Sequence, residues 1–278
     1  MDAAHNQVVF PANLPELFAA WERFPGAALL AGGTGLIRGR GHGALLNLPD
    51  NIISLDRLEE LRGVTRTERY LEIGAMISLN GIIRLGKPVP EALSAALREI
   101  AGPEVRNLAS IGGNICHEGC RLGSCAPLVA LDARYELRTT GASRWVSAAR
   151  FAASPGGPAL DPREVLSRIR IPLEQWDYTV YRKFPGKGDA AGAMVCIAAL
   201  EKDILSDIRL VFAGDTLLRD RSAEISLAGK RLPLDRREAA RFTALWEEFL
   251  SKAESPGPLR RSQILLFVEQ CVMQLTDY

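Results

Sequence analysis

Apolar residues recur along the chain either at the spacing of a helix or in short runs typical of strands. In the first half of the chain, segments of the two kinds alternate. Residues 11–24 (PANLPELFAAWERF) place apolar side chains from Leu14 to Trp21 at helical spacing behind Asn13, which predicts a short amphipathic helix. Brief apolar runs at 28–33 (ALLAGG), 51–56 (NIISLD) and 70–79 (YLEIGAMISL) predict strands, and the last strand is expected to end at Gly74-Ala75. Further helices are expected at about 78–85 and at 90–100 (PEALSAALREI), and a helical turn at 126–133, followed by a strand in ARYELRT.

The second half reads as strands followed by helices. Four apolar runs predict strands: VLSRIRIP, YTVYRKF, AAGAMVCIAAL and DIRLVFAG. Two helices are expected after them, at 236–253 and 258–276. SPGGPALDP, at 154–162, is typical of a linker or a surface loop. The order predicts an α+β protein with a break near residue 155.

Composition and charge exclude several classes of protein. The chain has 278 residues, enough for one large domain or two to three small ones. Its 34 basic and 33 acidic residues give a net charge of +1, so no global field favours nucleic acid or an anionic membrane. The N-terminus lacks signal-peptide features, and no apolar run approaches about 18 residues, so we expect a cytoplasmic protein. Five cysteines, an odd number, argue against a disulfide framework.

A glycine-rich stretch, LLAGGTGLIRGRGHG at 29–43, raises the question of a nucleotide site. A Rossmann fingerprint needs a long helix directly after its glycine turn. RGRGHGALLNLP at 38–49 contains three glycines and ends on a proline, so that helix is not expected. A P-loop is excluded because no Gly-Lys-Ser/Thr follows. What remains is a loop whose amides could hold an anion, with an ordinary glycine-rich connection as the alternative.

A second glycine pair, in VRNLASIGGNI at 105–115, changes this interpretation. Two glycine loops, each following apolar residues and each furnished with a hydroxyl group, could hold one extended ligand from two sides. A diphosphate is the natural candidate for such a ligand.

Taken together, these motifs resemble the FAD-binding medium subunit of molybdenum hydroxylases, a group that includes xanthine dehydrogenase and aerobic carbon monoxide dehydrogenase. AGGTGL is similar to that family's first flavin loop, A-G-G-T-D-L, and VRNLASIGGNI to its second, R-N-x-A-T-I-G-G-N. Weaker similarities lie in LLNLPDNIISLDRLEELRGV, IGAMISLNGI and VLSRIRIP with YRKF. The resemblance covers essentially the whole chain.

The resemblance implies a fold and a set of cofactor contacts. The fold is a two-lobed FAD-binding domain of the vanillyl-alcohol-oxidase type at 1–160, with lobes at about 1–56 and 57–160, then a C-terminal α+β domain of sheet and helices at 161–278. Lys183 is expected near the flavin ring, with a solvated strand lysine as the alternative. The implied contacts to FAD are Leu30, Ala31, Gly32, Gly33, Thr34, Gly35, Leu36, Ile37, Ser110, Ile111, Gly112, Gly113, Asn114, Leu166 and Lys183.

Two positions depart from the family's pattern. Gly35 stands where the first loop usually has Asp, and Gly123 where an acid usually follows the second loop. The replaced segment reads CHEGCRLGSC, so Cys116, Cys120 and Cys125, with His117, could ligate zinc or an iron–sulfur cluster. Free thiols lining the flavin site are the alternative, and we expect no metal.

The expected function is that of an FAD subunit in a molybdenum-hydroxylase-type oxidoreductase. Electrons would pass from iron–sulfur clusters through the flavin to NAD+ or another acceptor, and the iron–sulfur and molybdenum-cofactor subunits would be separate polypeptides. No side chain is expected to act as a nucleophile or general base, because the flavin carries the chemistry. The alternatives are a stand-alone flavin-dependent reductase and a degenerate, flavin-free assembly subunit.

Overall fold

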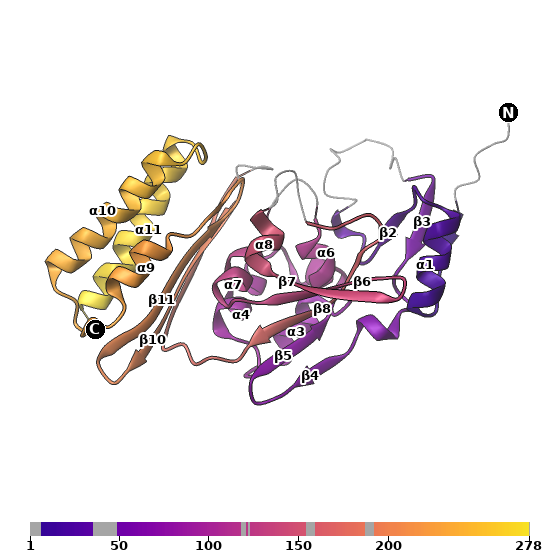
Figure 1. The fold of residues 1–278 in the computed structure, drawn as a ribbon, viewed down its shortest axis with the longest axis horizontal. Coiled ribbons are helices and arrows are strands. Elements are labelled where there is room, and N and C mark those ends of the chain that lie inside the picture. The colour runs from indigo at the N-terminus through magenta and orange to yellow at the C-terminus, as the bar shows by residue number, and fades with distance from the viewer. Residues whose placement is uncertain are drawn as a thin grey trace. The chain divides into compact units, whose positions relative to one another are not determined.

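The computed structural model describes residues 7–35, 49–117, 121, 123–153, 159–186 and 192–277. They form two compact units (Figure 1). The first comprises the described residues of Met1–Val89, Ile100–Glu118 and Ala133–Pro172. The second comprises those of Pro90–Glu99, Gly119–Asp132 and Leu173–Tyr278, so the chain crosses between the units several times.

The first unit contains two sheets. A parallel sheet has the order β1-β3-β2, and an antiparallel sheet has the order β4-β5-β8-β6-β7. Its elements are β1 (Gln7–Val9), α1 (Leu14–Arg23), β2 (Ala28–Leu30), β3 (Asn51–Ser54), the 3-10 turn η1 (Glu59–Leu61), β4 (Val64–Arg66), β5 (Tyr70–Gly74), α3 (Leu79–Arg84), α5 (Pro103–Leu108), α6 (Ile111–Ile115), β6 (Arg134–Thr139), β7 (Ala142–Ser147), α8 (Ala148–Ala153) and β8 (Val165–Pro172).

Helix α1 forms where the sequence predicts it. The side chain of Asn13 accepts a hydrogen bond from the Glu16 amide and caps the helix, and Leu17 is fully buried on its inner face. That face packs with Ile53 of β3 and with Leu58, so α1 covers the parallel sheet. Strand β2 pairs with β3 in this sheet, and the first glycine loop begins at the carboxyl end of β2.

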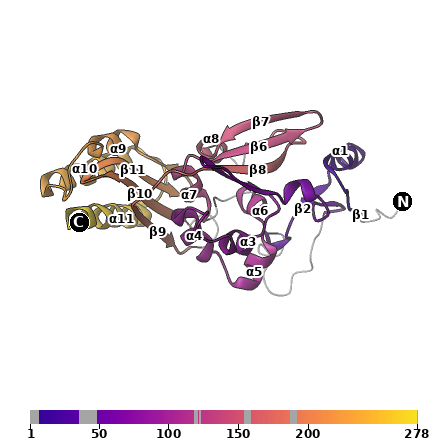
Figure 2. The same ribbon diagram turned by 90° about the horizontal axis from the view of Figure 1, so that it is seen from below.

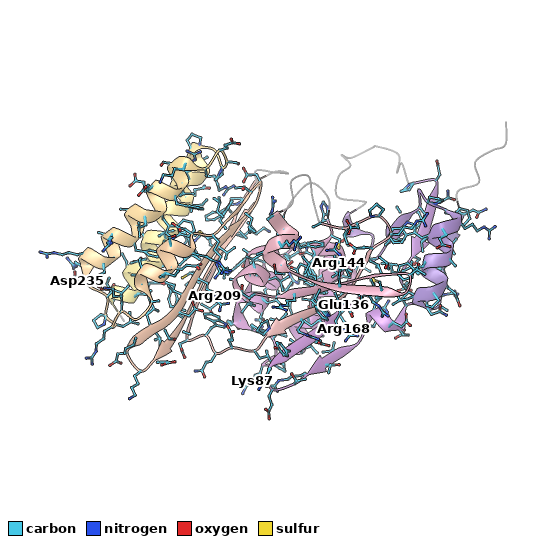
Figure 3. The ribbon with its side chains drawn as sticks, in the orientation of Figure 1. Lys87, Glu136, Arg144, Arg168, Arg209 and Asp235 are labelled. Carbon is cyan, nitrogen blue, oxygen red and sulfur yellow. The ribbon has the colours of Figure 1, made fainter. Side chains whose placement is uncertain are left out.

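The antiparallel sheet has one buried and one solvated face. Inward residues such as Leu71, Ile73 and Ile169 are buried, and charged residues alternate with them along β5 and β8. Glu136 of β6 lies beside Arg168 of β8 on the solvated face (Figure 3). Helices α3, α5 and α6 lie on the other side of the sheet from this face (Figure 2), and α6 contacts β8 directly.

Strand β8 shows how far the first unit extends along the chain. It pairs with both β5 and β6, so the sheet needs residues as far as Pro172. The division into domains at 56 and 160 stays a prediction. Of the expected linker at 154–162, residues 154–158 lie outside the described residues.

The second unit is built around the antiparallel sheet β12-β11-β10-β9. Helices α9, α10 and α11 cover one face, and α4 and α7 cover the other (Figure 1). Its elements are α4 (Glu91–Arg98), α7 (Cys125–Ala130), β9 (Tyr178–Phe184), β10 (Gly192–Glu201), β11 (Ile204–Ala213), β12 (Leu217–Leu218), α9 (Arg221–Leu227), α10 (Arg236–Lys252) and α11 (Pro258–Thr276).

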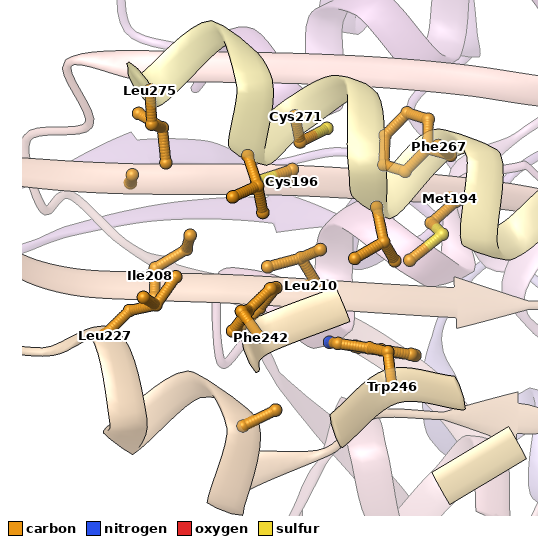
Figure 4. Packing of buried hydrophobic residues seen from close by; sticks show 14 of the residues in the cluster. Met194, Cys196, Ile208, Leu210, Leu227, Phe242, Trp246, Phe267, Cys271 and Leu275 are labelled. Carbon is orange, nitrogen blue, oxygen red and sulfur yellow. The ribbon is translucent and has the colours of Figure 1, made fainter. Parts of the chain in front are cut away.

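The two layers of helices explain why β10 is a continuous apolar run. Met194 and Cys196 face α10 and α11, where they pack with Trp246 and Phe267 (Figure 4). Val195 points to the opposite face and is also fully buried. A strand that is buried on both faces needs apolar side chains at successive positions. The second unit thus has a core of its own.

Most of the predicted elements form, and their ends are corrected by a few residues. The strand expected to end at Gly74-Ala75 does end at Gly74, and Ser78 caps α3 after the turn. The segment interpreted as a loop at 110–114 is the start of a short helix, α6, with Ser110 as its cap. Among the helices that the structure describes, none is long and apolar enough to cross a membrane.

Candidate functional site

The first glycine loop, residues 29–35, leaves the carboxyl end of β2. The Leu30 carbonyl still accepts a hydrogen bond from the Leu55 amide, and the chain then turns through Gly33, whose φ is +71°. This left-handed conformation favours glycine, since a Cβ would strain it. Thr34 and Gly35 are helical. The expected contacts Leu36 and Ile37, and the segment 38–48 on which the Rossmann interpretation was rejected, lie outside the described residues.

The amides of this loop point to an anion site. Within the described part of the chain, the amides of Gly32 and Gly33 have no hydrogen-bond acceptor. Buried or half-buried amides usually have one, so a ligand that accepts hydrogen bonds would complete them. Successive amides around a left-handed residue form a concave site that suits phosphate.

The second glycine loop, residues 108–117, comprises the end of α5, the turn after it and the short helix α6, and is held by backbone hydrogen bonds. The Gly112 amide donates to the Ala75 carbonyl at 2.8 Å, and the Ile111 amide donates to the Ile77 carbonyl at 3.0 Å. A Cβ on Gly112 would lie 2.7 Å from the Ala75 Cβ, so a larger residue would break this approach. The segment after β5 thus serves as the support of the second loop.

Ser110 and Asn114 are the polar side chains of the second loop. Ser110 is 3% exposed, and its hydroxyl oxygen accepts the Gly113 amide at 3.1 Å. Asn114 is also buried, at 7% exposed. Because the amides of residues 111–114 are bonded within the protein, the contribution of this stretch to a ligand would come from these side chains and from the exposed edge at Gly113.

The two loops meet in the first unit. A Cβ on Gly113 would lie 3.7 Å from the Ala31 Cβ, and a Cβ on Gly32 would lie 2.5 Å from the Leu108 carbonyl carbon. Neither loop contains Asp or Glu. The structure therefore brings the described residues of the two loops into contact at Gly32 with Leu108 and at Gly113 with Ala31.

The remaining predicted contacts lie on strands. Leu166 is buried on β8, the strand that α6 contacts. Lys183, on β9, belongs to the second unit, and its Nζ donates to the Glu99 carbonyl at 2.9 Å, beyond the last turn of α4. This bond suits a helix C-terminus, whose carbonyls favour a cation. The place of Lys183 beside a flavin stays a prediction.

The cysteines give no support to a metal centre. Burial raises the pKa of the Cys116 and Cys125 thiols to about 12, so neither is an activated thiolate nucleophile. Cys120 lies outside the described residues. Within the described ranges, no group of three or more His, Cys, Asp or Glu side chains could hold a metal ion.

One contact of the first loop was not expected from the sequence. The His117 imidazole lies against Gly35, with its Cδ2 3.2 Å from the position of a Gly35 Cβ. No spacing rule connects residues so far apart in the chain. The one sequence feature that indicates this contact is Gly35 itself, since a glycine in place of an acid leaves room for another side chain at that position.

One glycine loop lies at the carboxyl end of β2, and the second, at α5 and α6, packs against it. The FAD-binding domain of molybdopterin dehydrogenases matches residues 4–174, and the chain belongs to this family. It is 31% identical over 228 residues to the putative xanthine dehydrogenase FAD-binding subunit of Escherichia coli K12, covering 77% of this chain and 76% of the relative. It is 32% identical to the glyceraldehyde dehydrogenase medium chain of Sulfolobus acidocaldarius, covering 73% of this chain and 74% of the relative.

The solved structures give the same result. Carbon monoxide dehydrogenase from Hydrogenophaga pseudoflava has a chain that superposes with a TM-score of 0.79 at 26% identity, covering 99% of this chain and 96% of that chain. Quinoline 2-oxidoreductase from Pseudomonas putida 86, at 21% identity and a TM-score of 0.80, covers 98% of this chain and 96% of that chain and shares the fold. The resemblance read from the sequence, the α+β fold class and FAD as cofactor are confirmed. The protein is an FAD-binding oxidoreductase subunit of the molybdenum-hydroxylase type.

Proposed function

We propose that this chain carries electrons from partner iron–sulfur clusters through FAD to a terminal acceptor, with NAD+ as the first candidate. The observation that supports the proposal is the pair of glycine loops, one with unbonded amides and one rigidly supported, meeting in a single unit. When bound, FAD supplies the redox chemistry. The residues of the chain bind and orient it.

The division of labour between the loops follows from their hydrogen bonds. Among the described residues the amides of Gly32 and Gly33 have no acceptor, so they offer donors to a diphosphate. The second loop is anchored at Ala75 and Ile77, so Ser110 and Asn114 would meet the ligand at fixed positions. Leu166 and Lys183 complete the proposed set of contacts, and Leu36 and Ile37 extend the first loop.

The relatives' names support a multisubunit assembly. The Escherichia coli relative is named an FAD-binding subunit, and those from Hydrogenophaga pseudoflava and Sulfolobus acidocaldarius are named medium chains. We infer that this chain also works beside an iron–sulfur subunit and a molybdenum-cofactor subunit. Its cytoplasmic location, expected from the sequence, stays a prediction.

Two measurements test the proposal. The absorbance spectrum of the protein reconstituted with FAD should show bound oxidised flavin, with bands at about 370 and about 450 nm. A chain that retains no flavin would be the degenerate assembly subunit. Affinity purification from its native cells should recover iron and molybdenum with the chain, whereas a flavin-loaded chain without either metal would be a stand-alone reductase.

The acceptor is identified in the purified complex. The reduced complex is mixed anaerobically with NAD+, and NADH formation is followed together with the return of flavin absorbance. Flavin that reoxidises with oxygen or an artificial acceptor but not with NAD+ would contradict NAD+ as acceptor and leave the role of the subunit in electron transfer intact.

A further inference from the structure

Gly35 and His117 form a pair at the edge of the first loop. A Cβ on Gly35 would lie 3.2 Å from Cδ2 and 3.5 Å from Nε2 of the His117 imidazole. Gly35 is exposed and His117 is half-buried, so the ring covers the loop on one side and reaches solvent on the other. The absence of a side chain at position 35 makes room for the imidazole.

This pair brings a nitrogen group to two loop segments that have no charged side chain of their own. The loop segments 29–35 and 108–117 contain no lysine, arginine or acid, and His117 is the one ionisable nitrogen side chain in them. Its Nε2 lies 3.5 Å from the position of a Gly35 Cβ, and Gly35 follows Gly32 and Gly33 in the same loop. An imidazole N–H donates a hydrogen bond to a phosphate oxygen in either charge state.

We propose that His117 is a cofactor-binding residue that donates a hydrogen bond to the diphosphate of FAD beside Gly35. The inference rests on the proposed function, because it places a donor at the diphosphate site of the two loops. It gives Gly35 a role as well: a residue with a Cβ at position 35 would push the imidazole away from the ligand.

The test is a set of dissociation constants for FAD, measured by fluorescence titration of the flavin-free protein, with ADP as a competing probe. His117→Ala weakens FAD binding about 10-fold, the lower end for a hydrogen bond to a charged group, since the ring is partly solvated. His117→Gln keeps an N–H donor and stays within about 3-fold of the wild type. ADP shows the same loss as FAD, because both contain the diphosphate.

The glycine is tested by a double-mutant cycle. Gly35→Ala weakens FAD binding about 3-fold or more in the wild type, because the methyl group must displace the ring by a few tenths of an ångström. In the His117→Ala background the same change has no further effect. Gly63→Ala is the matched control: it is an exposed glycine of the same unit, and a Cβ there meets nothing within 4 Å.

The outcomes separate this inference from the proposed function. A wild-type protein that fails to bind FAD refutes the proposed function itself. Wild-type affinity in His117→Ala refutes the inference alone, as does a loss for FAD with unchanged ADP binding, which would place the ring at the flavin. Thermal unfolding without FAD shows whether each variant folds. If His117→Ala does not fold, His117→Gln and Gly35→Ala provide the test. FAD binding that is weakened equally in these two variants contradicts the donor role, because only His117→Gln keeps the N–H donor in place.

Discussion

At Gly32 the addition of a single methyl group, in Gly32→Ala, should push the two loops apart. A Cβ on Gly32 would overlap the Leu108 carbonyl oxygen and lie 2.5 Å from its carbonyl carbon. Non-bonded carbon atoms stay about 3.5 Å or more apart, so Gly32→Ala forces the loops apart by about 1 Å. Because the clash is with backbone on both sides, no side-chain rotation relieves it.

The size of the effect follows from what that movement breaks. Overpacking of this kind costs about 1–3 kcal/mol of stability. A ligand held from both sides would lose one or two hydrogen bonds to its charged diphosphate, which corresponds to about a 10- to 100-fold weaker FAD affinity. Urea unfolding of the flavin-free protein and FAD titration measure the two effects separately.

Gly26→Ala is the control for this experiment. It lies just before β2, and a Cβ there meets nothing within 4 Å. Its FAD affinity and stability should match those of the wild type. If Gly32→Ala binds FAD as tightly as Gly26→Ala, the two loops do not act as one site, and the reasoning is refuted.

Three further predictions concern the supports of the two units. Lys183→Met removes the cation that bonds the Glu99 carbonyl and should lower the free energy of unfolding by about 1 kcal/mol in urea titrations; a loss of FAD affinity alone would contradict the capping role. Arg209→Met should cost about 3 kcal/mol, because the buried guanidinium (Figure 3) bonds the Ala130 carbonyl and pairs with Asp132, Asp207 and Glu174; an unchanged urea midpoint would refute this. Hydrogen bonds from Arg144 hold the pKa of Glu164 below its usual value, so its contribution to stability is complete above about pH 5 and declines as pH falls; Glu164→Gln should lose stability at pH 7 and little at pH 3, and an equal loss at both would contradict the assignment.

The elements of the second unit could be predicted well from the sequence, and its topology could not. The apolar run of β10 and the periodicity of α10 and α11 mark these elements locally. The placing of α4 and α7 on the far face of this sheet depends on contacts between residues distant in the chain. Periodicity describes one segment at a time, so it carries no information about which sheet a helix covers.

The site shows the same division between local and long-range information. Glycine motifs marked both loops, because a left-handed turn at Gly33 and a close approach at Gly112 require glycine. The support of the second loop by Ala75, and the position of His117 against Gly35, could not be read from spacing. Both are contacts formed only when separate segments pack together.

A crystal structure of the chain with FAD tests the central claim, that the two loops form one diphosphate site, most directly. The account predicts the diphosphate between the loops, within hydrogen-bond distance of the amides of Gly32 and Gly33 and of the Ser110 hydroxyl. A dinucleotide bound elsewhere on the chain, or loops that stay empty at saturating FAD, would contradict it.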